Sequence, residues 1–127
     1  MKNVKDVQPI NIMEKFSLFE KLWTPHIIGE LNGQYVKLCK LKDDFVWHKH
    51  DHEDELFLVF KGVLRMDFRE GHSVKVKEGE VLIVPKGVEH RPYTDGDVVL
   101  NMLFEPKDTA HTGDAETEQT VKNLSWI

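Results

Sequence analysis

Three histidines and four carboxylates lie close together near the middle of the chain, where residues 47–55 read WHKHDHEDE. Imidazole nitrogens and carboxylate oxygens are common ligands of divalent first-row metals. Residues two apart on an extended chain point to the same side, so His48 and His50 can present both rings to one point. Glu55 begins the apolar run that follows and needs only a short loop to reach the same ion. This stretch therefore predicts a metal site.

His52 adds an alternative to this site. The pair His50 and His52 has the same spacing as His48 and His50. Alternation along an extended chain therefore does not decide which two histidines act together.

Length and composition favour one ordinary globular domain. The chain has 127 residues, of which 40% are hydrophobic and 31% charged, and its net charge is −5. We expect no nucleic-acid partner, because phosphate binding needs clustered Lys and Arg. We expect no membrane span, because no apolar run approaches about 20 residues. The N-terminus lacks the apolar stretch of a secretory signal, which favours a cytoplasmic location. Cys39 is the single cysteine, so an internal disulfide is excluded.

A short helical segment precedes a series of short strands. Asn11 and Glu14 have the spacing of a capping box, and Ile12, Phe16 and Phe19 recur at helical spacing until Thr24 and Pro25 end the element. The β-favouring runs that follow are separated by turn residues such as Asn32-Gly33. They cover residues 26–31, 34–41, 45–50, 55–60, 63–68, 73–77, 81–84, 89–93 and 98–104. Evenly spaced short strands of this kind predict an all-β barrel or sandwich.

The end of the chain has a different composition. Residues 108–119 are polar and acidic, but Val121, Leu124, Trp126 and Ile127 are apolar and costly to leave in water. We therefore expect this end to dock on the barrel or on a second subunit.

With the strands assigned, the chain resembles the small single-domain cupins. Their first motif is matched by His48, His50, Glu55 and Gly62, and their second by Gly79, Pro85, Gly87 and His90. Sixteen residues separate the two motifs, as in compact members of the family. Two positions depart from the fuller pattern, since Lys42 replaces a glycine and Thr94 replaces an asparagine. Neither is a ligand position in the family.

The resemblance implies a fold, a ligand set and an assembly. The fold is a double-stranded β-helix, the jelly-roll cupin barrel. Together with the patterns above, this divides the chain into an N-terminal helical segment at residues 1–25, the barrel at 26–105 and a tail at 106–127 that docks on the barrel or on a partner subunit. The ligands of one divalent transition metal ion (Fe, Mn, Ni or Zn) are His48, His50, Glu55 and His90. His52 leaves too few residues before Glu55 for the family spacing. Cupins of this size are commonly homodimers.

Two classes of function remain open. The resemblance allows a metal-dependent dioxygenase, isomerase, epimerase or lyase that acts on a small polar molecule, and fold does not choose among these. The alternative is a non-catalytic module that binds or senses a small ligand with the same metal site. No catalytic acid or base can be assigned, and His52, Tyr35 and Arg91 are candidates only for the pocket rim. Cys39 is expected to be a small buried hydrophobe. Phe45 and Trp47 are expected on the face opposite His48, covered by the N-terminal segment or a partner subunit.

Overall fold

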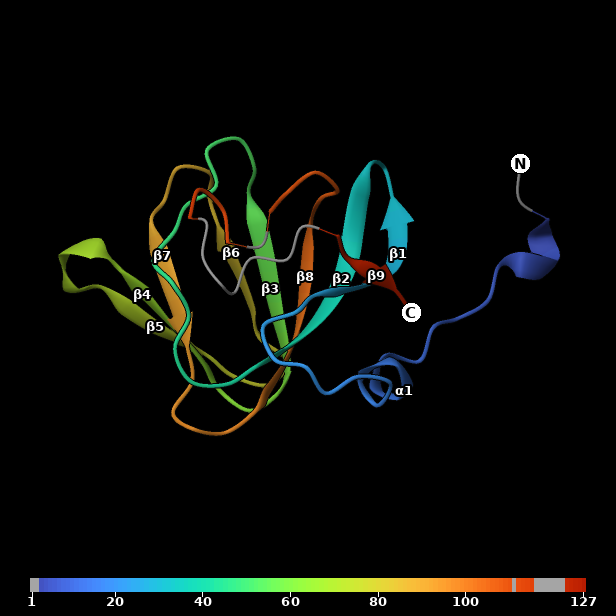
Figure 1. The fold of residues 1–127 in the computed structure, drawn as a ribbon, viewed down its shortest axis with the longest axis horizontal. Coiled ribbons are helices and arrows are strands. Elements are labelled where there is room, and N and C mark those ends of the chain that lie inside the picture. Colours follow the sequence, from blue (N-terminus) through green and yellow to red (C-terminus); the bar gives the residue numbers. More distant parts are fainter. Residues whose placement is uncertain (1–2, 111, 116–122) are drawn as a thin grey trace.

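Two β-sheets face each other in the computed structural model, which describes residues 3–110, 112–115 and 123–127 (Figure 1). The larger sheet has the strand order β6-β3-β8-β2-β1-β9 and the smaller has the order β5-β4-β7. The strands are β1 His26–Leu31, β2 Gln34–Leu41, β3 Glu55–Lys61, β4 Leu64–Phe68, β5 Ser73–Val76, β6 Val81–Val84, β7 His90–Tyr93, β8 Val99–Pro106 and β9 Ser125–Trp126. This is the expected double-stranded β-helix, with an apolar core between the two sheets.

The turn chemistry explains why the predicted strands fall so close to the observed ones. Asn32 and Gly33 both have positive φ angles, 51° and 76°. These angles suit a two-residue hairpin turn and are tolerated best by Asn and Gly. The antiparallel pairing of β1 with β2 accordingly begins at Leu31 opposite Gln34.

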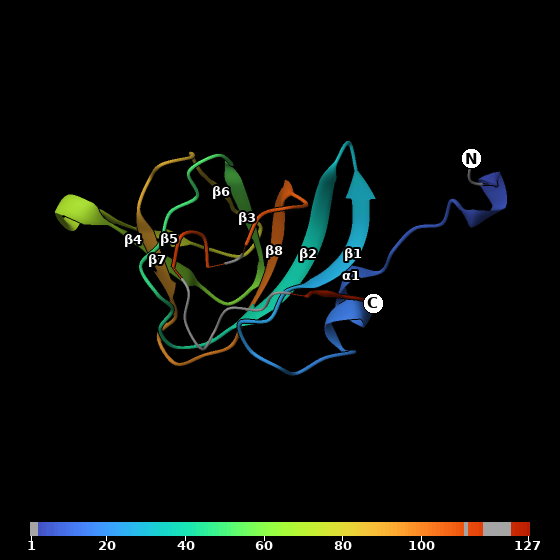
Figure 2. The same ribbon diagram turned by 45° about the horizontal axis from the view of Figure 1, so that its top comes forward.

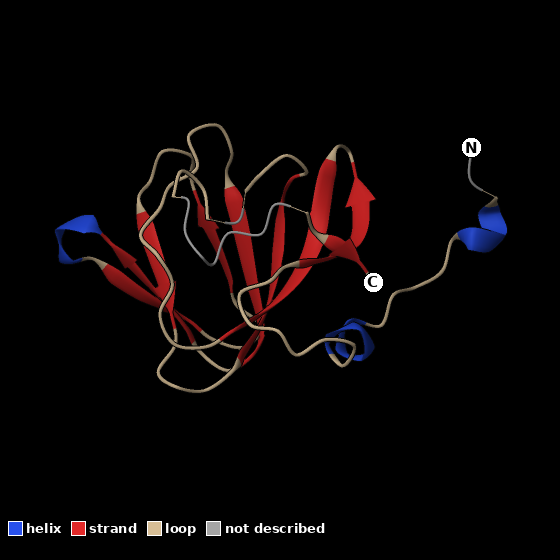
Figure 3. Cartoon of the chain, in the orientation of Figure 1, coloured by secondary structure: helices blue, strands red, loops and turns tan. Residues whose placement is uncertain are grey.

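Residues 45–50 do not form the predicted strand. The segment makes only isolated bridges, one from Asp44 to Tyr93 and one from His48 to His90. Between these bridges the backbone is irregular, so side chains do not alternate between two faces as they do along a strand (Figure 3). The predicted alternation of side chains along this segment is therefore wrong, although the histidines still reach the barrel interior.

The N-terminal helix is shorter than its apolar pattern predicts. Helix α1 covers Ile12–Phe16, and the side chain of Asn11 accepts a hydrogen bond from the Glu14 N–H at 3.0 Å. The chain leaves the helix at Ser17, so Phe19 lies on the non-helical segment beyond it. Phe16 and Phe19 still pack with Ile28 and Leu38 in a second apolar cluster, outside the one between the sheets. Two short 3₁₀ turns, Val4–Asp6 and Arg69–Gly71, complete the helical content of the described residues.

The last described residues pair with the barrel. Strand β9 runs parallel to β1, with Ser125 opposite His26, and the N–H of Ile127 donates to the carbonyl of Ile27 at 3.0 Å. Figure 2 shows this end of the chain beside β1. Ile127 packs against the Phe16 cluster, while Val121 lies outside the described residues. In the described part of the chain, no helix is long and apolar enough to cross a bilayer.

Candidate metal centre

Four buried side chains converge at one end of the barrel. They are His48, His50, Glu55 and His90, and one potential ligand atom from each lies within 4.8 Å of the others. Glu55 is the first residue of β3 and His90 the first of β7, whereas the two remaining histidines come from the irregular segment before β3. The group can hold a metal ion, and it unites the residues predicted from the two halves of the sequence.

Backbone hydrogen bonds bring the two halves together. The N–H of His48 donates to the carbonyl of His90 at 3.0 Å, and the N–H of His90 donates back at 2.8 Å. The carbonyl of His50 accepts from Gly87 at 2.7 Å. Gly87 has a φ of 80°, an angle that side-chain-bearing residues rarely adopt. The Pro85-Lys86-Gly87 turn therefore holds the second motif beside the histidines of the first.

Thr94 and Lys42, the two departures from the family pattern, lie beside one well-bonded turn. Thr94 Oγ1 accepts from the Asp43 N–H at 2.9 Å, and the Thr94 N–H donates to the Asp43 carbonyl at 3.0 Å. Asp43 has a positive φ of 62°. The threonine hydroxyl thus closes the loop that leads to the histidines.

Two histidines are held with their Nε2 atoms toward the centre of the group. The Nδ1 of His48 lies 2.9 Å from the carbonyl oxygen of Val46, and the Nδ1 of His90 lies 2.9 Å from that of Val88. A carbonyl oxygen only accepts, so Nδ1 must carry the proton in both rings. In the neutral rings Nε2 then keeps its lone pair, which is the form that binds metal.

Several polar atoms of the group have no hydrogen-bond partner among the described residues. Glu55 Oε1 lies 3.2 Å from His50 Nε2 and 3.5 Å from His90 Nε2, but none of these three atoms makes a hydrogen bond of normal geometry. Leaving buried polar atoms unpaired costs free energy. A cation at the centre of the group would satisfy all three atoms at once, so the donor set fits a metal ion.

Burial and charge set the protonation of these groups. Burial, and then the neighbouring His90, lowers the pKa of His48 to about 4, so this ring is neutral near pH 7. Burial alone would lower the pKa of His50, but the close contact with Glu55 and its negative charge outweigh burial and raise that pKa. Burial likewise opposes ionisation of Glu55, yet its polar contacts with Glu105, His50 and His90 hold its pKa well below the usual range.

The buried side chains of Glu105 and Lys37 lie behind Glu55 and form a polar row with it. Glu105 on β8 faces Glu55 on the neighbouring strand, and burial together with the charge of Glu55 raises the pKa of Glu105 well above its usual range. Lys37 on β2 lies 3.0 Å from Glu105 Oε1, and both side chains are fully buried. Lys37 also donates to the carbonyl of Thr109 at 3.4 Å, which attaches the loop after β8.

The sequence reasoning missed Lys37 and Glu105. A signal existed, because Val99, Asn101, Leu103 and Glu105 alternate along one strand and all face inward. A carboxylate on the buried side of a strand needs a partner. The pairing across β3, β8 and β2 depends on strand order, which the local pattern does not give.

His52 lies outside the group. It is exposed and lines an outer cavity of about 200 Å³ together with His50, Glu53 and Asp108. Gly113 also lines this cavity, and a Cβ added there would lie 2.3 Å from the Lys49 carbonyl oxygen and 2.9 Å from the His48 ring. The loop carrying Gly113 therefore lies directly against the histidine segment.

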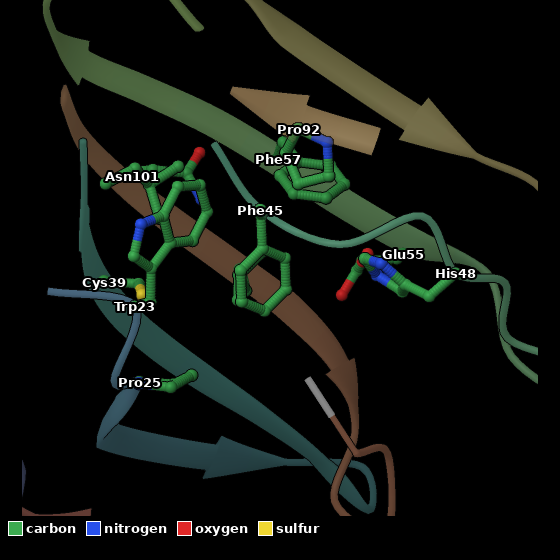
Figure 4. Close-up of a pocket in the computed structure, with 11 residues that line it drawn as sticks. Trp23, Pro25, Cys39, Phe45, His48, Glu55, Phe57, Pro92 and Asn101 are labelled. Atoms are coloured by element: carbon green, nitrogen blue, oxygen red, sulfur yellow. The ribbon is translucent and has the colours of Figure 1, made fainter. Parts of the chain in front are cut away.

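An inner cavity of about 20 Å³ lies on the other side of the group (Figure 4). His48 and Glu55 stand at one end, Asn101 and Trp23 at the other, and Phe45 between them. Phe45 stacks on Trp23 with ring centres 4.4 Å apart and contacts the His48 ring edge-on. The expectation that Phe45 points away from the histidine side is therefore wrong, although the N-terminal segment does cover it. Trp47 lies beneath the Arg69 guanidinium, 3.9 Å from the ring centre.

The other rim candidates do not reach this inner cavity. Arg91 alternates with the inward-facing His90 and Pro92, and it forms ion pairs with Asp67 at 2.9 Å and Asp44 at 3.3 Å. Tyr35 packs edge-on against Trp126 near the chain end.

Cys39 lines the inner cavity, and burial, followed by the charges of Glu105 and Glu55, raises the pKa of its thiol. The prediction of a small buried residue without nucleophilic character agrees with this position.

Comparisons with known proteins agree with this architecture. The family model described as "Cupin domain" matches residues 39–105, which include all four residues of the group. A cupin-2 domain protein from Shewanella frigidimarina is 41% identical with a TM-score of 0.75, covering 77% of this chain and 94% of that one. A protein from Neisseria meningitidis is 32% identical with a TM-score of 0.71, covering 79% and 100%. The uncharacterised protein YdbB of Bacillus subtilis is 38% identical over 64 residues. That match covers 50% of this chain and 57% of the length of YdbB.

The buried row gives a stability prediction. Replacing Glu105 by Leu leaves the Lys37 ammonium buried without its ion-pair partner and should lower the free energy of unfolding by about 3–5 kcal/mol. The double change Lys37→Met with Glu105→Leu removes both groups and should restore most of that loss. Urea unfolding of the three proteins measures both effects. Equal destabilisation in the single and double variants would show that the two side chains are not coupled.

Proposed function

This chain belongs to the cupin family, and from that premise we propose that it binds one divalent first-row transition metal ion and acts on a small polar molecule in the barrel cavity. The ligands in this proposal are His48, His50, Glu55 and His90. The observation that carries it is the convergence of three buried atoms that find no partner among the described residues: His50 Nε2, Glu55 Oε1 and His90 Nε2.

The donor set restricts the ion and its chemistry. Three imidazoles and one carboxylate suit Fe, Mn, Ni or Zn better than Ca or Mg, which prefer oxygen ligands. When bound, such an ion supplies a Lewis acid and keeps coordination positions open for other molecules. The chain's own residues hold the lone pairs inward through the Nδ1 bonds of His48 and His90 and keep bulk water from the group by burying it.

One observation favours the alternative, a metal-containing module that binds or senses a ligand without turnover. Among the residues that line the inner cavity, Cys39, His48 and Glu55 are the titratable ones. Two of them are proposed ligands, and the third is a thiol whose pKa burial raises. A reaction that needs proton transfer by a free side chain therefore has no candidate general base in this wall.

Metal uptake tests the site directly. We expect about one equivalent of transition metal in the native protein by elemental analysis and none in the double variant His48→Ala with His90→Ala, because two of the four ligands are gone. His52→Ala with His72→Ala is the matched control, since both of these histidines are exposed and neither belongs to the group. Circular dichroism checks that both variants fold. Stoichiometric metal in a folded His48/His90 variant would refute the site.

A substrate panel separates catalysis from binding. The metal-loaded protein is incubated with neutral and anionic hydroxy and carbonyl compounds, with and without dioxygen, and consumption is followed by mass spectrometry. The enzyme proposal predicts turnover that disappears on removal of the metal and returns when it is added back. Binding of a panel compound, detected by NMR, with no turnover of any compound would favour the sensor.

We also propose that two copies of the chain form a homodimer through the outer face of the larger sheet. Val81 and Ile83 on the edge strand β6 are 53% and 58% exposed. The N-terminal arm, residues 3–10, runs away from the body of the molecule (Figures 1 and 2) and leaves Val4 83% and Val7 73% exposed. Both sets of exposed apolar side chains are removed from water if the N-terminal arm of one copy covers strand β6 of the other.

Sedimentation analysis tests this assembly. We expect a dimer for the native chain and a shift toward monomer when Val81 and Ile83 are both replaced by Lys, because each lysine places a charge in the apolar contact. Val63→Lys is the control, since Val63 is 41% exposed in the turn between β3 and β4. A native monomer, or a double-lysine variant that stays dimeric, would contradict the proposed interface.

A further inference from the structure

Asn101 is a buried amide whose side chain makes no hydrogen bond within the described part of the chain. Its side chain is 0% exposed, and neither Oδ1 nor Nδ2 has a partner among the described residues. Its cross-strand neighbours are Cys39 on β2 and Val59 on β3, which offer no strong hydrogen-bonding group. An unpaired buried amide costs free energy, so Asn101 lowers the stability of the fold unless a ligand or a water supplies the partner.

The amide lies in the wall of the inner cavity, at the end away from the metal group (Figure 4). Asn101 and Glu105 are four residues apart on one strand, which separates their Cα atoms by about 13 Å. Cys39 also lies at the Asn101 end, and His48 and Glu55 lie at the other end. The rest of the wall is aromatic or aliphatic and consists of Trp23, Pro25, Leu41, Phe45, Phe57, Pro92 and Leu103. The cavity thus has a polar group at each end and an apolar middle.

Charge and size restrict what can enter. None of the described residues that line the cavity is a lysine or arginine, and the one buried ammonium nearby, Lys37, is paired with Glu105. An anionic group at the Asn101 end would lose its hydration without a cation to replace it.

The cavity volume of about 20 Å³ is far below the roughly 300 Å³ at the lower end of pockets for drug-sized ligands. A cavity of this size holds about one water molecule, so even a small organic molecule enters only if the Trp23 indole, which stacks on Phe45 and donates to the Lys42 carbonyl at 2.8 Å, moves aside.

We infer that Asn101 is a specificity-determining residue that binds the hydroxyl, carbonyl or amide group of a small uncharged molecule. This inference deepens the proposed function, on which it rests, by naming the ligand class of the same cavity. The amide both donates and accepts, so it pairs with a group that does the same. The class excludes phosphorylated and carboxylated molecules whose charge would face Asn101.

Matched pairs of small probes test the inference. Acetamide and hydroxyacetone are the neutral probes, and acetate and pyruvate are their anionic counterparts. We expect a neutral probe to bind with a dissociation constant in the millimolar range and to shift the side-chain amide resonances of Asn101 in NMR spectra. Asn101→Leu should weaken that binding about ten-fold without lowering stability, because it removes an unpaired buried amide. Asn123→Leu, at an exposed position, should leave binding unchanged.

The outcomes separate this inference from the metal proposal. Titrations are run on metal-free and zinc-loaded protein, and zinc content is measured on each variant, so a failed metal site leaves the metal-free titration intact. Preferential shifts of the Asn101 amide by the anions, or no binding of either neutral probe, would overturn the inference. Unchanged affinity in Asn101→Leu would assign the amide to an ordered water instead. A loss of stability in that variant would make Asn101 a structural residue.

Discussion

The burial of one carboxylate, Glu55, is the constraint on which the rest of the centre depends. An ionised carboxylate inside a protein loses its hydration, at a cost of several kcal/mol. Here the compensation comes from both sides, since His50 and His90 face one oxygen while Glu105 approaches from the next strand. Lys37 in turn pairs with Glu105 at 3.0 Å and places one positive charge behind the two carboxyl groups. The polar row thus crosses β3, β8 and β2, and the order of these strands in the larger sheet makes it possible.

The same row divides the barrel interior into two chemical regions. On one side the histidines and the loop carrying Gly113 enclose the polar centre. On the other side the cavity wall is almost entirely apolar, and Phe45 is the residue at which the two regions meet, because its ring contacts both Trp23 and His48. The irregular backbone before β3 allows this contact. A regular strand would have turned Phe45 and His48 to opposite faces.

Local sequence patterns sufficed for most of the strands, but they failed for residues 45–50 and for the contacts between strands. The Asn32-Gly33 turn and the alternation along β3 and β8 depend on neighbouring residues, so they can be recognised in the chain itself. The convergence of His48, His50, Glu55 and His90 was predictable because the two halves of this group carry recognisable spacings. Lys37 could not be assigned to Glu105, since 68 residues separate them and only the sheet order makes them neighbours. The length of α1 was overestimated for a related reason, because Phe19 packs on the sheet from a non-helical segment and mimics the helical period.

The contrast between the two buried polar clusters bears on function. Lys37 Nζ lies 3.0 Å from Glu105 Oε1, so the burial of these two atoms is explained within the fold itself. The facing atoms of Glu55, His50 and His90, and the amide of Asn101, have no such explanation among the described residues. Natural folds accept unpaired buried polar groups chiefly where a ligand, ion or water completes them. Glu55 and Asn101, which carry two of these unsatisfied groups, line opposite ends of one cavity, so a small ligand or an ordered water in that cavity can complete either of them (Figure 4).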